Sequence, residues 1–120
     1  MSGNNIANGT IINNSNYDMW LVSSNIASGH WNTAPITVPR QSTTTAFVAQ
    51  GTQGTATGTS GSMTYSFNGT TATVVLGFDD AYSSSNSAYS QDSAGSLFKT
   101  SANVPKSGSN VVFTYVVTGP

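Results

Sequence analysis

The side chains best suited to bind a ligand are concentrated between Phe78 and Tyr89. Asp79 and Asp80 follow an apolar run, Tyr82 comes two residues later, and a Ser/Asn stretch leads to Tyr89. Carboxylates beside Ser and Asn oxygens bind hard cations, and aromatic rings on loops stack on sugars or enter a bilayer interface. The aspartates are equally suited to accept hydrogen bonds from loop amides. The segment predicts a ligand-binding loop without a metal site, because its spacing matches no EF-hand.

Catalytic groups are sparse in this chain. His30 is the only histidine, and no serine lies in a Gly-x-Ser-x-Gly nucleophile elbow. Asp79 and Asp80 are adjacent, so on a strand they would point to opposite faces and would not share a proton. The chain has no glutamate, and a two-carboxylate glycosidase would need Asp18 or Asp92 as its second acid. We therefore predict a protein that is not an enzyme and that carries no cofactor.

The low charge of the chain restricts its partners. Three basic and four acidic residues give a net charge of −1. Nucleic acid is excluded because phosphate neutralisation requires a cluster of Lys and Arg, and the same count excludes polybasic attraction to anionic lipid. The absence of cysteine excludes disulfides and thiolate metal sites. The partners that remain are neutral or zwitterionic: a sugar, a phosphocholine-type headgroup, a sterol-rich bilayer or another copy of the chain.

Hydrophobic periodicity predicts strands along the whole chain. Residues 61–67 alternate polar and large apolar side chains, Asn68-Gly69 follows, and residues 71–78 return as an almost continuous apolar run. This pattern predicts a hairpin closed by a type I′ turn. Prolines at both ends confine the 34–40 segment to a sheet edge. Further strands are expected at 6–14, 17–23, 43–49 and 111–118, with a short strand beginning at Leu97-Phe98.

These elements predict the fold class and the place of the aromatic residues. Short strands at spacings near ten residues are typical of a single-domain, all-β sandwich of antiparallel strands. We expect residues 1–120 to form this one domain, with little or no helix and with residues 1–5 disordered. Trp31 would lie in a turn at 28–32, and Tyr82 and Tyr89 in or beside a loop. Their alternative role is to plug the ends of the sandwich.

The first residues carry no targeting signal. The segment MSGNNIANGTII lacks the basic and apolar regions of a signal peptide. No apolar run in the chain approaches the roughly 18 residues of a spanning helix. We therefore expect synthesis in the cytoplasm, with any release by a non-classical route.

Two short motifs resemble the aegerolysins, a family of small acidic β-sandwich proteins of fungi and bacteria. The first is the strand entry Gly58-Thr59-Ser60-Gly61, which is similar to the family's Gly-Thr-x-Gly. The second is the run from Phe78 to Tyr82, which corresponds to the family's Trp-Asp-x-Pro-Trp motif. It has Ala81 in place of the proline and weaker aromatic residues in place of both tryptophans. Asn86 would be the turn asparagine that follows, and Tyr89 the later aromatic. More loosely, the region is similar to the actinoporins and fungal fruit-body lectins.

The resemblance implies a non-enzymatic protein that binds membrane lipid headgroups of the sphingolipid type. Trp31, Tyr82 and Tyr89 would lie at the interface, and Asp79 and Asp80 would fix the loop or bind a headgroup cation. The protein would be one component of a cytolytic system, in which a second protein or a strand rearrangement forms the pore. Two alternatives remain from the residues themselves. One is a lectin, and the other is a protein that self-assembles into a homo-oligomeric filament or crystalline array by strand pairing.

Overall fold

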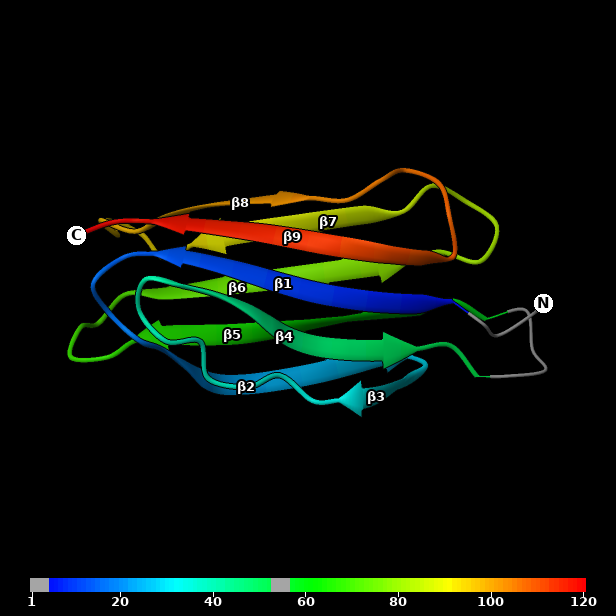
Figure 1. Cartoon of the computed structure of the whole chain (residues 1–120), viewed down its shortest axis with the longest axis horizontal. Coiled ribbons are helices and arrows are strands. Elements are labelled where there is room, and N and C mark those ends of the chain that lie inside the picture. Colours follow the sequence, from blue (N-terminus) through cyan, green and yellow to red (C-terminus); the bar gives the residue numbers. More distant parts are fainter. Residues whose placement is uncertain (1–4, 53–56) are drawn as a thin grey trace.

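A computed structural model of the protein describes residues 5–52 and 57–120, which form two packed β-sheets (Figure 1). The expectation of disorder at residues 1–5 lies outside these ranges except at Asn5, which is buried. The described residues contain no helix, and the prediction of an all-β sandwich is confirmed. The strands are β1 (Ile6–Asn14), β2 (Met19–Ser28), β3 (His30–Thr33), β4 (Ser42–Gln50), β5 (Thr59–Phe67), β6 (Thr73–Asp80), β7 (Ser87–Asp92), β8 (Lys99–Asn103) and β9 (Asn110–Thr118).

The order of the strands brings the two ends of the sequence together in one sheet. The larger sheet has the order β3-β4-β1-β9-β8, and the smaller one has the order β2-β5-β6-β7. β1 pairs antiparallel with β4 but parallel with β9, from Ile6 opposite Asn110 to Asn14 opposite Thr118. The parallel pair departs from the all-antiparallel pairing expected from the sequence. Among the described residues, no helix is long and apolar enough to cross a membrane.

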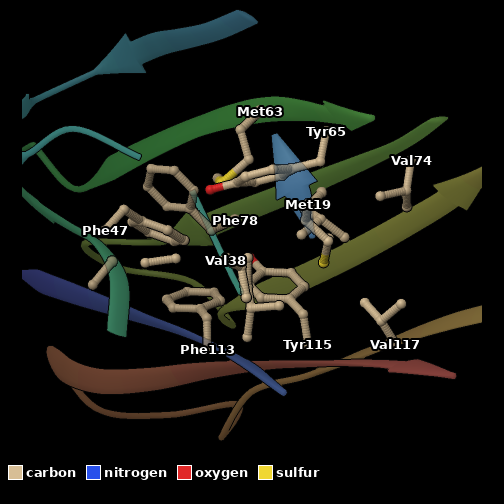
Figure 2. Close-up of a cluster of buried hydrophobic side chains, with 14 of the residues drawn as sticks. Met19, Val38, Phe47, Met63, Tyr65, Val74, Phe78, Phe113, Tyr115 and Val117 are labelled. Carbon is tan, nitrogen blue, oxygen red and sulfur yellow. The ribbon is translucent and has the colours of Figure 1, made fainter. Parts of the chain in front are cut away.

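The core lies between the two sheets and follows from the alternation of side chains along each strand. In β9, Val111, Phe113, Tyr115 and Val117 point inward and are buried. They meet inward residues of β5 and β6 from the opposite sheet, among which Figure 2 labels Met63, Tyr65, Val74 and Phe78. Two tyrosine hydroxyls in this core are satisfied: that of Tyr65 donates to the Ile36 carbonyl at 2.7 Å, and that of Tyr115 to the Gly77 carbonyl at 2.8 Å.

The predicted hairpin is present as β5 and β6, but its turn differs from the predicted one. A type I′ turn requires positive φ at both central residues, and here only Gly69, at φ 83°, has one. The Thr70 amide donates to the Phe67 carbonyl at 3.0 Å, which closes a four-residue turn with its positive φ at the third position, as in type II. The type I′ prediction is therefore wrong. The connection is also longer, because Phe67 and Ala72 close it with a second backbone bond of 3.3 Å.

The predicted strand at 17–23 is observed as Met19–Ser28, and the one predicted to begin at Leu97-Phe98 begins at Lys99. Three other segments differ in the type of structure they form. Residues 34–40 are not a strand: apart from the bridge between Val38 and Met19, the segment has no ladder, because its two prolines cannot donate to one. The predicted turn at 28–32 is confined to Gly29, at φ 81°, and the chain then pairs with β4 as β3. β7 lies where a loop was predicted. Its side chains are too polar to show the alternation of an edge strand.

Candidate functional site

Three connections that the structure describes in full meet at the end of the sandwich that lies at the right of Figure 1. They join β2 to β3, β6 to β7 and β8 to β9, and β4 ends and β5 begins at the same end. Five of the six side chains singled out in the sequence belong to this end, because they lie on β3, at the end of β6 or in the β6–β7 loop. They are Trp31, Asp79, Asp80, Tyr82 and Asn86. The topology therefore brings most of the predicted residues to one end of the sandwich, where some of their side chains are buried and others are exposed.

An open groove of about 540 Å³ lies between the β6–β7 loop and the β8–β9 loop at this end. Residues 81–85 form one wall and residues 106–109 form the other. The walls carry serine hydroxyls on both sides, the ring of Tyr82, which is 45% exposed, and Lys106 as the single charged residue. The groove lining contains no carboxylate. Its chemistry therefore suits a ligand that has an anionic group and an apolar or cationic group.

Asn86 holds the two walls of the groove together. Its Nδ2 donates to the carbonyls of Pro105 at 3.1 Å and Gly108 at 3.0 Å, and its Oδ1 accepts from the Ala81 amide at 3.0 Å. Its backbone amide donates to the Lys106 carbonyl at 2.9 Å. The side chain is buried, and these bonds use both of its polar atoms. Asn86 therefore shapes the groove from beneath.

Asp80 lies at the end of β6 and faces the interior, where it is fully buried. The Nδ2 of Asn5 donates to Asp80 Oδ1 at 3.1 Å and to the Asp80 and Ala81 carbonyls at 3.2 and 3.0 Å. Asp80 Oδ2 has no hydrogen-bond partner among the described residues. Burial raises the pKa of Asp80 to about 6, opposed by the Asn5 hydrogen bond and reinforced by the negative charge of Asp79. This carboxyl joins the two sheets and does not face solvent.

Asp79 points to the other face of β6, as expected of a neighbouring strand residue, and is exposed. It pairs with Ser60 of β5 and Ser87 of β7. The described residues hold no group of three or more His, Asp or Glu side chains placed to bind a metal ion. The two aspartates are thus in different environments, one dry and one in water.

The other two predicted aromatic residues lie away from the groove. Trp31 is half-buried and packs on the core, with ring centroids 5.7 Å from Phe47 and 5.6 Å from Phe78. Tyr89 lies on the outer face of the smaller sheet, where its ring covers Gly77 on the neighbouring strand and remains 51% exposed. Trp31 therefore closes the end of the core, and Tyr82 is the aromatic residue of the predicted set that lines the groove.

The Gly-Thr-x-Gly strand entry has a structural purpose at the same end. A Cβ at Gly58 would lie 2.3 Å from the Asp80 carbonyl oxygen and 2.9 Å from the Tyr82 amide. A Cβ at Gly61 would lie 2.5 Å from the Asn25 carbonyl oxygen on β2. Only glycine permits these backbone approaches. The motif therefore positions the start of the β6–β7 loop.

The far wall of the groove, residues 106–109, is not among the residues that the sequence analysis singles out. The signal that was available is Lys106, one of three basic residues in the chain, set among Pro, Ser and Gly. What the sequence could not give is the meeting of this turn with the Tyr82 loop, because that depends on the pairing of β1 with β9 and on Asn86.

No protein-family model and no curated protein matches this sequence. Among solved structures, the lipid binding protein Nakanori is similar to it, with a TM-score of 0.79 and 12% identity over 96% of this chain and 71% of Nakanori. IP-1A from Alcaligenes faecalis is similar with a TM-score of 0.70 and 14% identity, over 96% of this chain and 92% of IP-1A. At these identities the likeness is one of fold. It supports the β-sandwich fold.

Proposed function

We propose that this protein is a non-enzymatic module that binds lipid headgroups in the groove between the β6–β7 and β8–β9 loops. The observation that carries the proposal is the groove itself, in which Tyr82, several serine hydroxyls and Lys106 converge on one space. The fold likeness to a lipid binding protein supports the same class of ligand. The net charge of −1 favours a headgroup without net charge over an anionic surface.

Within this class we propose a sphingolipid-type headgroup that carries phosphate and a quaternary ammonium. Lys106 and the serine hydroxyls of the groove would bind the phosphate oxygens. The Tyr82 ring would bind the ammonium by a cation–π contact, and the groove has no carboxylate that would compete for it. Asn86 would keep the two walls at the spacing that both contacts need.

Any cytolytic role would require more than this chain in the form described. The described residues provide no spanning helix, and the strands are used in two complete sheets. A pore would therefore need a second protein or a rearrangement of strands. We propose that the chain supplies lipid recognition in such a system.

Co-sedimentation with vesicles tests the proposal. Vesicles of sphingomyelin with cholesterol, of phosphatidylcholine with cholesterol and of a neutral lipid without phosphate are mixed with the wild type, Tyr82→Ala and Lys106→Gln. The matched control is Trp20→Ala, since Trp20 is 52% exposed and lies near the opposite end of the sandwich. We expect binding to the phosphate-bearing vesicles, weakened roughly tenfold by either groove change, which corresponds to about 1.4 kcal/mol.

The possible outcomes test the proposed ligand and the proposed binding site separately. No binding of the wild type to any vesicle would contradict the proposed function. Binding that Trp20→Ala weakens and Tyr82→Ala leaves intact would keep the lipid and move the site to the other end. Preference for sphingomyelin over phosphatidylcholine would establish the sphingolipid type.

A further inference from the structure

A second pocket lies at the opposite end of the sandwich, near the C-terminus in Figure 1. Its volume is about 310 Å³, and it is lined by Tyr17, residues 70–72, residues 93–98 and Pro120. Ligand pockets commonly begin at about 300 Å³, so this one has room for a small ring. It shares no residue with the groove at the other end.

The pocket is built from segments that are fixed before any ligand arrives. The Thr70 hydroxyl donates to the Phe67 carbonyl and accepts from the Ala72 amide, which fixes one wall. The Ser96 hydroxyl accepts from the Phe98 amide and donates to the Phe98 carbonyl, which fixes the second. The Asn16 amide donates to the Pro120 carbonyl at 2.9 Å, which holds the C-terminal residue beside Tyr17. Little conformational entropy would be lost on binding.

Two of the residues that line this pocket carry hydroxyls without a hydrogen-bond partner among the described residues. The hydroxyls of Tyr17 and Thr71 make no hydrogen bond within the described part of the chain. Apolar surface stands beside them: Leu97 on the rim is 75% exposed, and the rings of Tyr17 and Phe98 meet edge to face at 5.4 Å. No side chain that lines the pocket is charged. The surroundings therefore suit a neutral ligand that offers hydroxyls on its edge and C–H groups on its face.

We propose that this pocket binds a neutral pyranose ring. A pyranose has this combination of hydroxyl edges and an apolar face, and it would stack on Tyr17 and Leu97 while the hydroxyls of Tyr17 and Thr71 bond its edge. An anionic ligand is disfavoured because no lining side chain is cationic, and a wholly apolar ligand would leave the free hydroxyls unpaired. The sugar can come from a glycolipid headgroup or from a protein-linked glycan.

Backbone amide shifts in ¹⁵N-labelled protein provide the test, with methyl galactopyranoside, methyl glucopyranoside, methyl mannopyranoside and methyl N-acetylglucosaminide as probes. We expect at least one glycoside to shift amides at 17, 70–72 and 93–98 and to leave those at 81–86 and 106–109 unchanged. Thr71→Val and Tyr17→Phe each remove one hydroxyl and should weaken binding roughly three- to tenfold. Thr43→Val is the matched control, since Thr43 is exposed on β4 and does not line the pocket.

Absence of shifts with all four glycosides would overturn the proposal, as would shifts that neither pocket variant reduces. Tyr82→Ala should leave glycoside binding unchanged, so the result does not depend on the lipid groove. Where a glycoside binds, vesicles bearing its glycolipid and beads bearing its glycoprotein conjugate identify the source of the sugar. Either one, released by the free glycoside, supports the same pocket.

Discussion

The ring of Phe47 occupies the space that a side chain at Gly9 would need. The two residues pair across β1 and β4, and a Cβ on Gly9 would lie 1.9 Å from Phe47 Cε2. A second pair has the same geometry on the outside of the molecule, where a Cβ on Gly77 would lie 1.9 Å from Tyr89 Cε2. Phe47 is fully buried and Tyr89 is half exposed. A Cβ at either glycine would thus clash equally with a ring, but the ring of Tyr89 can move and that of Phe47 cannot.

This difference predicts unequal costs for the same substitution. Gly9→Ala should lower the free energy of unfolding by about 2–3 kcal/mol, because the buried ring of Phe47 cannot move aside. Gly77→Ala should cost less than about 1 kcal/mol, because Tyr89 turns into solvent and alanine is favoured over glycine in a strand. Urea denaturation measures both changes. Equal losses would mean that the Phe47 side of the core is loosely packed.

The buried carboxyl of Asp80 predicts an unusual pH dependence. Its pKa is about 6 in the folded protein against an ordinary value of 3.8, so the folded state binds this proton more tightly than the unfolded state. The contribution of Asp80 to stability is therefore complete below about pH 4, and up to about 3 kcal/mol of it is lost as the pH rises towards 6 and above. Unfolding free energies measured from pH 4 to pH 7 check this loss.

Two variants separate Asp80 from the other acids. Asp80→Asn is neutral throughout, so its unfolding free energy should lack the fall between pH 4 and pH 6. Asp79→Asn removes the neighbouring charge that raises the pKa of Asp80, so the fall should become smaller and remain present. A pH profile that is the same in all three proteins would show that Asp80 keeps an ordinary pKa.

Because the buried side chain of Asn86 braces both walls of the groove, its removal should reduce both stability and lipid binding. Asn86→Ala removes three hydrogen bonds and leaves the Pro105 and Gly108 carbonyls without this donor, which should cost roughly 2–3 kcal/mol. The walls of the groove would separate, so vesicle binding should fall together with stability. Ser87→Ala is the control, because Ser87 is exposed next to Asn86 and does not line the groove, so its change should stay within about 0.5 kcal/mol and leave vesicle binding unchanged. Unchanged stability in Asn86→Ala would contradict its bracing role.

The hydroxyl of Tyr65 predicts local order in the proline-bounded segment. Tyr65→Phe removes the bond to the Ile36 carbonyl and should cost about 1 kcal/mol. Hydrogen exchange at the amides of Ile36 and Val38 should accelerate beyond this global change. Tyr115→Phe removes a similar buried bond elsewhere, so it should cost as much without that local effect. Acceleration in both variants would indicate that the segment is held by overall stability alone.

The sequence was sufficient for those elements whose hydrophobic pattern is local. Residues 6–14 were predicted as a strand with the observed bounds, and the hairpin around Asn68-Gly69 was found from its turn residues and alternation. The turn type was wrong because Asn-Gly also fits a turn in which only the glycine has positive φ. Local sequence patterns therefore predict the position of a turn better than its conformational type.

The parts of the site that were missed depend on contacts between distant residues. Nothing near Asp80 in the sequence indicates that Asn5 will bond it, or that Asn86 will use its amide on carbonyls of the β8–β9 loop. Tyr89 was placed beside a loop because β7 is an edge strand with little apolar alternation. The residue types between Phe78 and Tyr89 predict a ligand-binding loop, and only the folded structure reveals that the β8–β9 loop faces Tyr82.

The parallel pairing of β1 with β9 also governs how the chain reaches this structure. Residues 6–14 must wait for residues 110–118 before the middle of the larger sheet is complete, although β4 can cover the other side of β1 earlier. Contacts of such long sequence separation slow folding, because the chain loses the entropy of loop closure before the contact forms and stabilises the structure. During synthesis on the ribosome, β1 would keep one open edge until β9 emerges, which makes that interval the time of greatest exposure to aggregation.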